Sequence, residues 1–156
     1  MAQSKSLSRT PPSAIVAASV VSSRLTVETG GRGFTDLTAE IATFVREAGG
    51  REGAVTLFIR HTSASLTIQE NADPSVLVDL STALSRLAPE GAGWTHDTEG
   101  PDDMPAHVKT MLTQTSLHIP VLDGRLALGI WQAIYLIEHR SRPHRRDIVL
   151  QFVGAT

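Results

Sequence analysis

Apolar and polar positions along the chain repeat with two different periods, which predict strands and helices in turn. Residues 14–27 are rich in Val, Ile, Thr and Ser with rough alternation, which is typical of a strand, and GGRGF follows as a turn. Apolar residues then recur at helical spacing over residues 37–48. The short apolar run AVTLFIRH, residues 54–61, predicts a second strand that carries His61 at its end.

Two further helices are expected in the middle of the chain. An aspartate followed by a proline suits the N-cap and first turn of a helix over residues 73–87. Residues 103–112 predict another helix, and on it Asp103 and His107 share a face because they are four positions apart.

The last third of the chain predicts strands at residues 116–121, 125–140 and 148–154, with a basic loop before the last of them. Strands lie before and after the grouped helices, without a regular alternation of strand and helix. This order indicates an α+β fold with mixed β-sheets.

Composition limits the classes of function. With 156 residues, 41% of them hydrophobic, the chain can bury one core but is too short for two. A net charge of −2 and an aromatic content of 4% argue against a nucleic-acid partner. The absence of cysteine excludes disulfides and thiolate ligands and suits the cytoplasm. No apolar run is long enough to span a membrane, so we expect no membrane partner.

The first 14 residues are polar and Ser-rich, and Pro11 and Pro12 lie near their end. Their composition is like that of a transit peptide, but they lack the apolar segment of a secretory signal. We expect a disordered N-terminal tail over residues 1–14 and a single domain over residues 15–156.

The stretch WTHDTEGPDDMPAHVK, residues 94–109, gathers imidazole and carboxylate side chains: His96, Asp97, Glu99, Asp102, Asp103 and His107. Zinc, manganese and iron accept such ligands, and three protein ligands with one open position are usual in catalytic sites. The spacing matches no standard ligand motif. A solvated acidic loop that caps a helix therefore stays open as the alternative.

Two more stretches suit phosphate. In RHTSASLTIQEN, a strand end is followed by small hydroxyl side chains that can hold phosphate oxygens. In EHRSRPHRRD, four arginines lie within seven residues, and guanidinium groups bind phosphate in a forked geometry. A Ser/Thr-rich turn and a solvated basic turn are the alternatives. No nucleophile elbow, P-loop or dinucleotide-binding motif is present.

Three blocks, HTSASLTIQENADPSV, HDTEGPDDMPAHVK and GRLALGIWQAIYLIEHR, resemble the YjbQ-like family, described as secondary thiamine-phosphate synthases. The resemblance runs from about Val16 to Gly154. It implies helices clustered on one side of mixed β-sheets, a homotrimer, and a histidine cluster able to bind zinc or a similar divalent metal. Within GIWQA, Ile130 and Ala133 replace the Thr and Gly that are usual in the family, and the first replacement removes a hydroxyl group.

The resemblance and the chemistry of the side chains together give expected roles for individual residues. The metal ligands are His61, His96 and His107. The catalytic carboxylates are Glu70, Asp103 and Glu138. The substrate-binding residues are Thr62, Ser63, Asn71, Lys109, Trp131, Gln132, His139, Arg140, Arg145 and Arg146.

The reaction that the resemblance implies joins a hydroxymethylpyrimidine pyrophosphate to a thiazole phosphate and releases pyrophosphate, which can carry its own magnesium. Charge builds on the leaving pyrophosphate while a pyrimidine-methyl cation develops, so arginine and lysine would stabilise the first and a carboxylate the second. Two alternatives remain at this stage. One is a metal-dependent hydrolase of a small phosphorylated or carbonyl substrate, and the other is a non-catalytic trimer that binds a metal or metabolite.

Overall fold

The computed structural model describes residues 9–156. Most of the expected N-terminal tail, residues 1–8, lies outside the described residues. Residues 9–18 form no helix or strand and are exposed, and the first strand begins at Ser19. None of the helices within residues 9–156 is long and apolar enough to cross a membrane.

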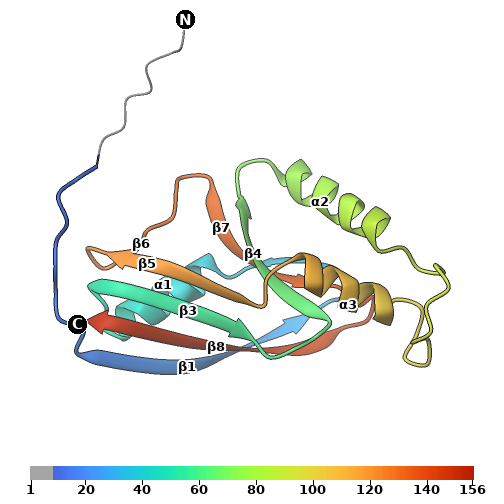
Figure 1. The fold of residues 1–156 in the computed structure, drawn as a ribbon, viewed down its shortest axis with the longest axis horizontal. Coiled ribbons are helices and arrows are strands. Elements are labelled where there is room, and N and C mark those ends of the chain that lie inside the picture. Colours follow the sequence, from blue (N-terminus) through green and yellow to red (C-terminus); the bar gives the residue numbers. More distant parts are fainter. Residues whose placement is uncertain (1–8) are drawn as a thin grey trace, which may run out of the picture.

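Two antiparallel sheets and three helices make up the fold (Figure 1). The five-stranded sheet has the order β1-β8-β3-β5-β6, with β1 Ser19–Thr29, β8 His144–Ala155, β3 Glu52–Ile59, β5 Ser116–Leu122 and β6 Arg125–Leu126. The three-stranded sheet has the order β2-β7-β4, with β2 Gly33–Asp36, β7 Gln132–Glu138 and β4 Ala64–Glu70. The helices are α1 Thr38–Glu47, α2 Pro74–Leu87 and α3 Asp103–Leu112.

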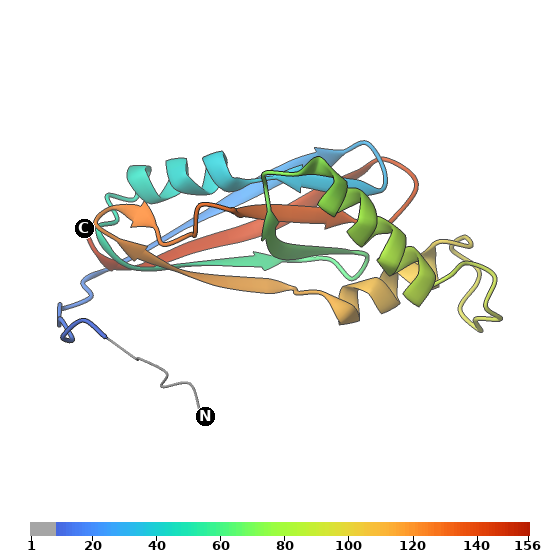
Figure 2. The same cartoon turned by 90° about the horizontal axis from the view of Figure 1, so that it is seen from above.

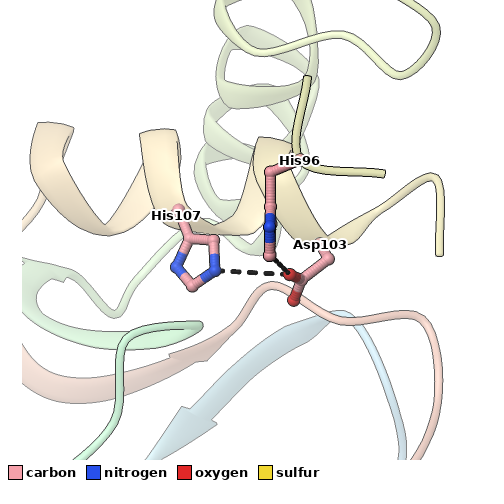
Figure 3. A group of neighbouring side chains, drawn as sticks. All are labelled: His96, Asp103 and His107. Atoms are coloured by element: carbon pink, nitrogen blue, oxygen red, sulfur yellow. Dashed lines mark hydrogen bonds and ion pairs between the residues drawn. The ribbon is translucent and has the colours of Figure 1, made fainter. Parts of the chain in front are cut away.

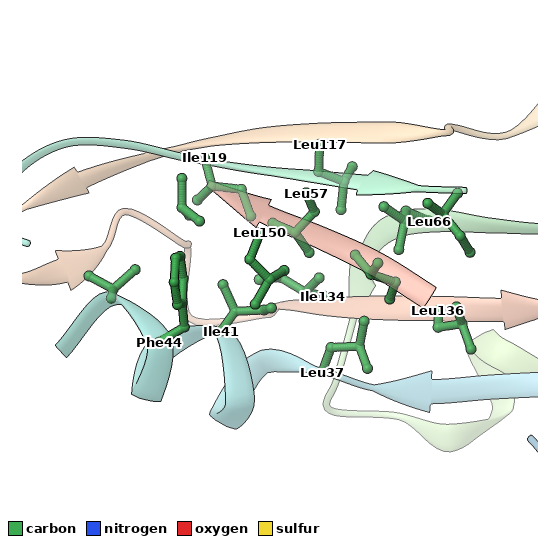
Figure 4. Close-up of a cluster of buried hydrophobic side chains, with 14 of the residues drawn as sticks. Leu37, Ile41, Phe44, Leu57, Leu66, Leu117, Ile119, Ile134, Leu136 and Leu150 are labelled. Atoms are coloured by element: carbon green, nitrogen blue, oxygen red, sulfur yellow. The ribbon is translucent and has the colours of Figure 1, made fainter. Parts of the chain in front are cut away.

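The hydrophobic core lies between the five-stranded sheet and a second layer formed by α1 and the three-stranded sheet (Figure 4). Helix α1 contributes Ile41, Phe44 and Val45, which recur at helical spacing and are all buried. Strand β5 alternates exposed and buried residues along its whole length, so one of its faces meets the core. In β7, by contrast, every residue after Gln132 is buried, because both faces of this central strand are covered.

The expected α+β class and single domain are confirmed, with two differences in detail. All strand pairs within residues 9–156 are antiparallel, so the sheets are not mixed. Parallel neighbours need a crossover that brings the chain back in the same direction, and no connection here does so. The helices also do not share one side: α1 lies toward the end that holds the C-terminus, whereas α2 and α3 lie toward the other end (Figure 2).

Candidate metal centre and anion-binding residues

Two histidines converge on one buried carboxylate at the start of α3 (Figure 3). His96 Nε2 lies 2.9 Å from Asp103 Oδ2, and His107 Nε2 lies 3.3 Å from the same oxygen. One ligand atom from each of the three residues lies within 4.8 Å of the others. Asp103 and His107 are one helical turn apart on α3, while the loop before the helix brings His96 to them.

The hydrogen bond on the far side of the His107 ring places a hydrogen on Nδ1. Nδ1 lies 2.9 Å from the carbonyl oxygen of Thr62, which can only accept, so Nδ1 carries the hydrogen. The other nitrogen, Nε2, then faces Asp103 either as part of a cationic imidazolium or with a free lone pair. A lone pair turned toward a carboxylate is repulsive unless a cation lies between them. Such a carbonyl bond at the second nitrogen is how metal-binding histidines are commonly oriented.

The separations of these atoms fit a metal ion. Two ligand atoms that each lie about 2.1 Å from one ion are about 3.0 to 3.4 Å apart at octahedral or tetrahedral angles. The two distances from Asp103 Oδ2, 2.9 and 3.3 Å, lie close to this interval. Three protein ligands would leave further coordination positions for water or substrate.

Arg140 holds the carboxylate in place. Its side chain donates to the other oxygen of Asp103 through Nη1, and its Nη2 donates to the carbonyl oxygen of Glu99. Its Nε lies 3.3 Å from Asp102 Oδ2 as an ion pair, and that oxygen accepts hydrogen bonds from the backbone N–H and the hydroxyl of Ser141. Although burial works against ionisation, the Ser141 bonds and Arg140 lower the pKa of Asp102 to about 2. Arg140, expected to bind substrate, is therefore engaged by two carboxylates.

His61 does not join this group within one chain. The backbone N–H of Asp147 donates to His61 Nε2 over 2.8 Å, so the lone pair of that nitrogen is occupied and Nδ1 carries the hydrogen. Burial, together with the positive charge of Arg146, lowers the pKa of His61 and keeps it neutral. Asp103 thus takes the place beside His96 and His107 that the sequence analysis gave to His61.

Four of the predicted residues meet instead in a separate cleft of about 450 Å³. His61, Thr62, Ser63 and Arg146 line it, and Phe58 lies at its edge as an exposed aromatic. Arg146 Nη2 donates to the Ser63 hydroxyl over 3.0 Å. The cleft combines hydroxyl, imidazole and guanidinium donors, which is the chemistry that the sequence predicted for phosphate oxygens.

Glu138 and Arg146 form a buried ion pair. Two hydrogen bonds of 2.6 and 2.7 Å join them, and Glu138 also accepts from the Thr29 hydroxyl and from the backbone N–H of Arg140. Burial opposes ionisation of Glu138, but these bonds outweigh it and lower its pKa. Glu138 is thus a buried carboxylate that is paired with Arg146. Arg145, next along β8, points the other way because strand residues alternate, and its side chain is 70% exposed, 4.0 Å from Glu28.

His139 and Lys109 are buried rather than open to a large cleft. His139 Nε2 lies 2.8 Å from the Ser65 hydroxyl, and burial lowers the pKa of His139 to about 4. Ser65 is itself fully buried, so this pair is closed to a substrate. Lys109 is 5% exposed, and it lines a small pocket with His139 on the side of α3 away from His107.

The remaining predicted residues lie at the other end of the three-stranded sheet. Glu70 pairs with Gln132 at one end of the β4–β7 ladder, and Ala64 pairs with Glu138 at the other. Six strand residues separate the two ends by roughly 20 Å. Asn71 and Trp131 belong to the first end, where the Asn71 N–H donates to the Trp131 carbonyl oxygen. Within one chain, the structure does not bring these residues to His96 and His107.

Asp103, expected as a catalytic carboxylate, lies where its carboxylate could bind a metal ion together with His96 and His107, and its spacing of four residues from His107 carried that signal. Arg32, which lines the pocket beside Lys109, follows the glycine-rich turn and gave no signal of its own.

Comparisons with known proteins agree with the three sequence blocks. Residues 23–155 match the family described as UPF0047 protein YjbQ-like. The UPF0047 protein of Synechocystis sp. is 49% identical over 131 residues, which cover 83% of this chain and 89% of that protein. The UPF0047 protein YjbQ of Salmonella typhimurium is 41% identical over 131 residues, which cover 83% of this chain and 95% of that protein.

Solved structures share the fold. An uncharacterized YjbQ/UPF0047-family protein from Clostridium acetobutylicum has a TM-score of 0.77 at 33% identity, covering 83% of this chain and 98% of that one. A hypothetical protein from Aeropyrum pernix has a TM-score of 0.80 at 28% identity, covering 86% and 99%. The chain therefore belongs to the UPF0047 YjbQ-like family.

Proposed function

We propose that this protein binds a divalent metal ion through His96, Asp103 and His107 and uses it on a small phosphorylated substrate. One observation carries the proposal: two imidazole nitrogens face the same carboxylate oxygen, while the second nitrogen of His107 is committed to the Thr62 carbonyl oxygen. Without a cation among them, His107 would have to carry a hydrogen on Nε2 as well as on Nδ1, whereas His96 could donate to Asp103 from Nε2 as a neutral tautomer. Zinc, manganese and iron accept this ligand set.

The coupling of hydroxymethylpyrimidine pyrophosphate with thiazole phosphate is the reaction we favour. In it, the bond from the methylene carbon to the pyrophosphate oxygen breaks and a bond from that carbon to the thiazole nitrogen forms. A divalent ion held by His96, Asp103 and His107 would supply positive charge to the leaving group. His61 Nδ1–H and the hydroxyls of Thr62 and Ser63 can donate to phosphate oxygens in the cleft. Glu138 balances the charge of Arg146, and Arg146 Nη2 donates to the Ser63 hydroxyl and so orients it in the cleft.

Hydrolysis of a small phosphorylated compound is the second candidate, favoured by a specific feature. Glu70 and Gln132 lie at one end of the β4–β7 ladder, and Glu138 lies at the opposite end, roughly 20 Å away. A single chain thus offers the proposed metal ligands and a cleft with phosphate donors, and hydrolysis needs no more than these. Coupling would also need a carboxylate beside the pyrimidine cation, and Glu70 of the same chain is too distant to be that carboxylate.

Metal affinity tests the proposed centre. Titration calorimetry with zinc should give about one ion per chain, and His107→Ala or His96→Ala should lose at least a hundredfold in affinity, since loss even of an outer partner costs ten- to a hundredfold. His118→Ala is the matched control, because His118 is exposed on β5 and bonds only Thr56 among the described residues. His61→Ala should retain the ion. Equal zinc affinity in the parent and His107→Ala would exclude the centre.

Turnover separates the two reactions. Metal-loaded protein should form thiamine phosphate from the two precursors at a rate that His107→Ala does not reach. Release of phosphate from a single phosphorylated compound without coupling would favour hydrolysis. Metal binding without either activity would leave a non-catalytic metal-binding protein.

A further inference from the structure

A second site lies on the opposite side of α3. Lys109 is two residues beyond His107, so the two side chains leave the helix about 200° apart. Lys109 runs inward, is 5% exposed, and lines a pocket of about 40 Å³. The pocket lies between α2 and the β2–β7 pair, and its polar lining comes from Arg32, Ser81, Ser85, Lys109, Glu138 and His139.

The charge of Lys109 is not neutralised by the chain. Among residues 9–156, no carboxylate lies within 4.0 Å of its side-chain nitrogen. The nearby acids have other partners: Glu90 pairs with Arg32, Asp102 with Arg140, and Glu138 with Arg146. Burial, followed by the positive charge of Arg32, lowers the pKa of Lys109.

Buried charges in proteins are normally paired, because an isolated ammonium loses its hydration without compensation. His139, whose pKa burial lowers to about 4, is a neutral imidazole that can neither balance the charge of Lys109 nor add to it. Two serine hydroxyls one turn apart on α2 face the same space as the lysine and the arginine. A pocket of this size has room for a group of a few heavy atoms, such as a phosphate.

We propose that this pocket is a phosphate-binding site, separate from the metal centre, in which Lys109 and Arg32 supply the charge and Ser81 and Ser85 the hydroxyl contacts. Its ligand class is inorganic phosphate or the phosphate group of a monoester. Arg32 lines the pocket and also pairs with Glu90, and both side chains are less than half exposed, so a bound phosphate would share Arg32 with that carboxylate. The proposal does not rest on metal binding or on the proposed reaction.

Phosphate titration of chelator-treated protein at low salt tests this site, because the chelator removes any phosphate held by a metal. Lys109→Met keeps the length of the side chain without its charge and should weaken binding of inorganic phosphate about tenfold or more. Arg145→Met removes an exposed arginine and should bind like the parent. Phosphate should raise the thermal midpoint of the parent but not of Lys109→Met.

Two further variants keep the test decisive. Ser85→Leu fills the pocket from the exposed α2 and should also abolish phosphate binding, even if Lys109→Met folds poorly. His107→Ala should bind phosphate normally, and Lys109→Met should bind zinc normally. The two variants therefore test the metal centre and the phosphate site independently of each other. Equal phosphate affinity in the parent, Lys109→Met and Ser85→Leu, or no binding at millimolar phosphate, would overturn the proposal.

Discussion

At the scale of single residues, partners distant in the chain decide what each predicted site residue does. Thr62 is 45 positions from His107, and Asp147 is 86 positions from His61. The sequence therefore predicted which residue types lie near the site. It could not predict which of them would bind a metal ion, which would hold another side chain in place and which would donate a hydrogen bond. Only Asp103 and His107, four apart on one helix, had a relation that local spacing could predict.

We expect the Glu138 carboxylate to stabilise the folded protein. Glu138→Gln leaves Arg146 buried without a counter-charge, and breaking a buried pair costs about 3 to 5 kcal/mol. Urea unfolding should report a loss of that order. A catalytic role would instead show as full stability with lost turnover, and that outcome would contradict the structural assignment.

His139 should make stability depend on pH. Its pKa in the folded protein, about 4, is below the unfolded value near 6.5, so the unfolded chain binds the proton first as pH falls. Its contribution is fully present above pH 6.5 and decreases by about 1.4 kcal/mol per pH unit down to about pH 4.

The measurement is the difference in unfolding free energy between pH 7 and pH 5, taken with a chelator present. The parent should lose about 2 kcal/mol more than His139→Gln, which cannot titrate in this range. Parallel pH profiles for the two proteins would show that His139 is not held neutral.

At the scale of elements, the helices were predictable because their signals are local. Asp73 caps α2 through the N–H of Ser75 at 2.8 Å, and proline follows it as expected. The strands were less predictable than the helices. Strand β2 occupies what reads as a glycine turn, and β4 was missed although Ala64, Leu66 and Ile68 alternate with polar residues. The pairing of β4 with β7 joins segments far apart in sequence, which no local pattern reveals.

Close packing between β3 and β8 gives a prediction at this scale. Gly53 and Gly154 are paired across the two strands, and a Cβ on Gly154 would lie 2.1 Å from the Glu52 carbonyl oxygen and 2.7 Å from the Phe152 ring. Gly154→Ala should therefore destabilise the protein by about 1 to 3 kcal/mol or more. Gly30→Ala is the control, because a Cβ there meets nothing within 4 Å. Equal thermal midpoints for the two variants would show that the strands can separate without cost.

At the scale of the whole molecule, the exposed apolar surface argues for assembly. The apolar run in β7 is covered within the chain and gives no such evidence. Helix α2 gives evidence for assembly, because it is amphipathic yet none of its residues is buried within the chain. Large apolar side chains stay exposed on α2, α3 and the loop before β7: Val78, Leu87, Met111, Leu112, Ile130 and Trp131.

We propose, as the family resemblance implied, that the protein is a homotrimer that covers part of this surface. Light scattering at micromolar concentration should give three times the chain mass of 16.7 kDa. Met111→Glu and Trp131→Glu should shift the mass toward that of one chain. A monomeric parent protein would contradict the assembly.

The position of a bound ion tests the metal centre most directly. Anomalous diffraction at the zinc absorption edge, from crystals grown with zinc, should show one ion about 2.0 to 2.2 Å from His96 Nε2, His107 Nε2 and an Asp103 carboxylate oxygen. His61 Nε2 should keep its bond from the Asp147 N–H. An ion bound by His61, or no ion near His96 and His107 at saturating zinc, would contradict the account.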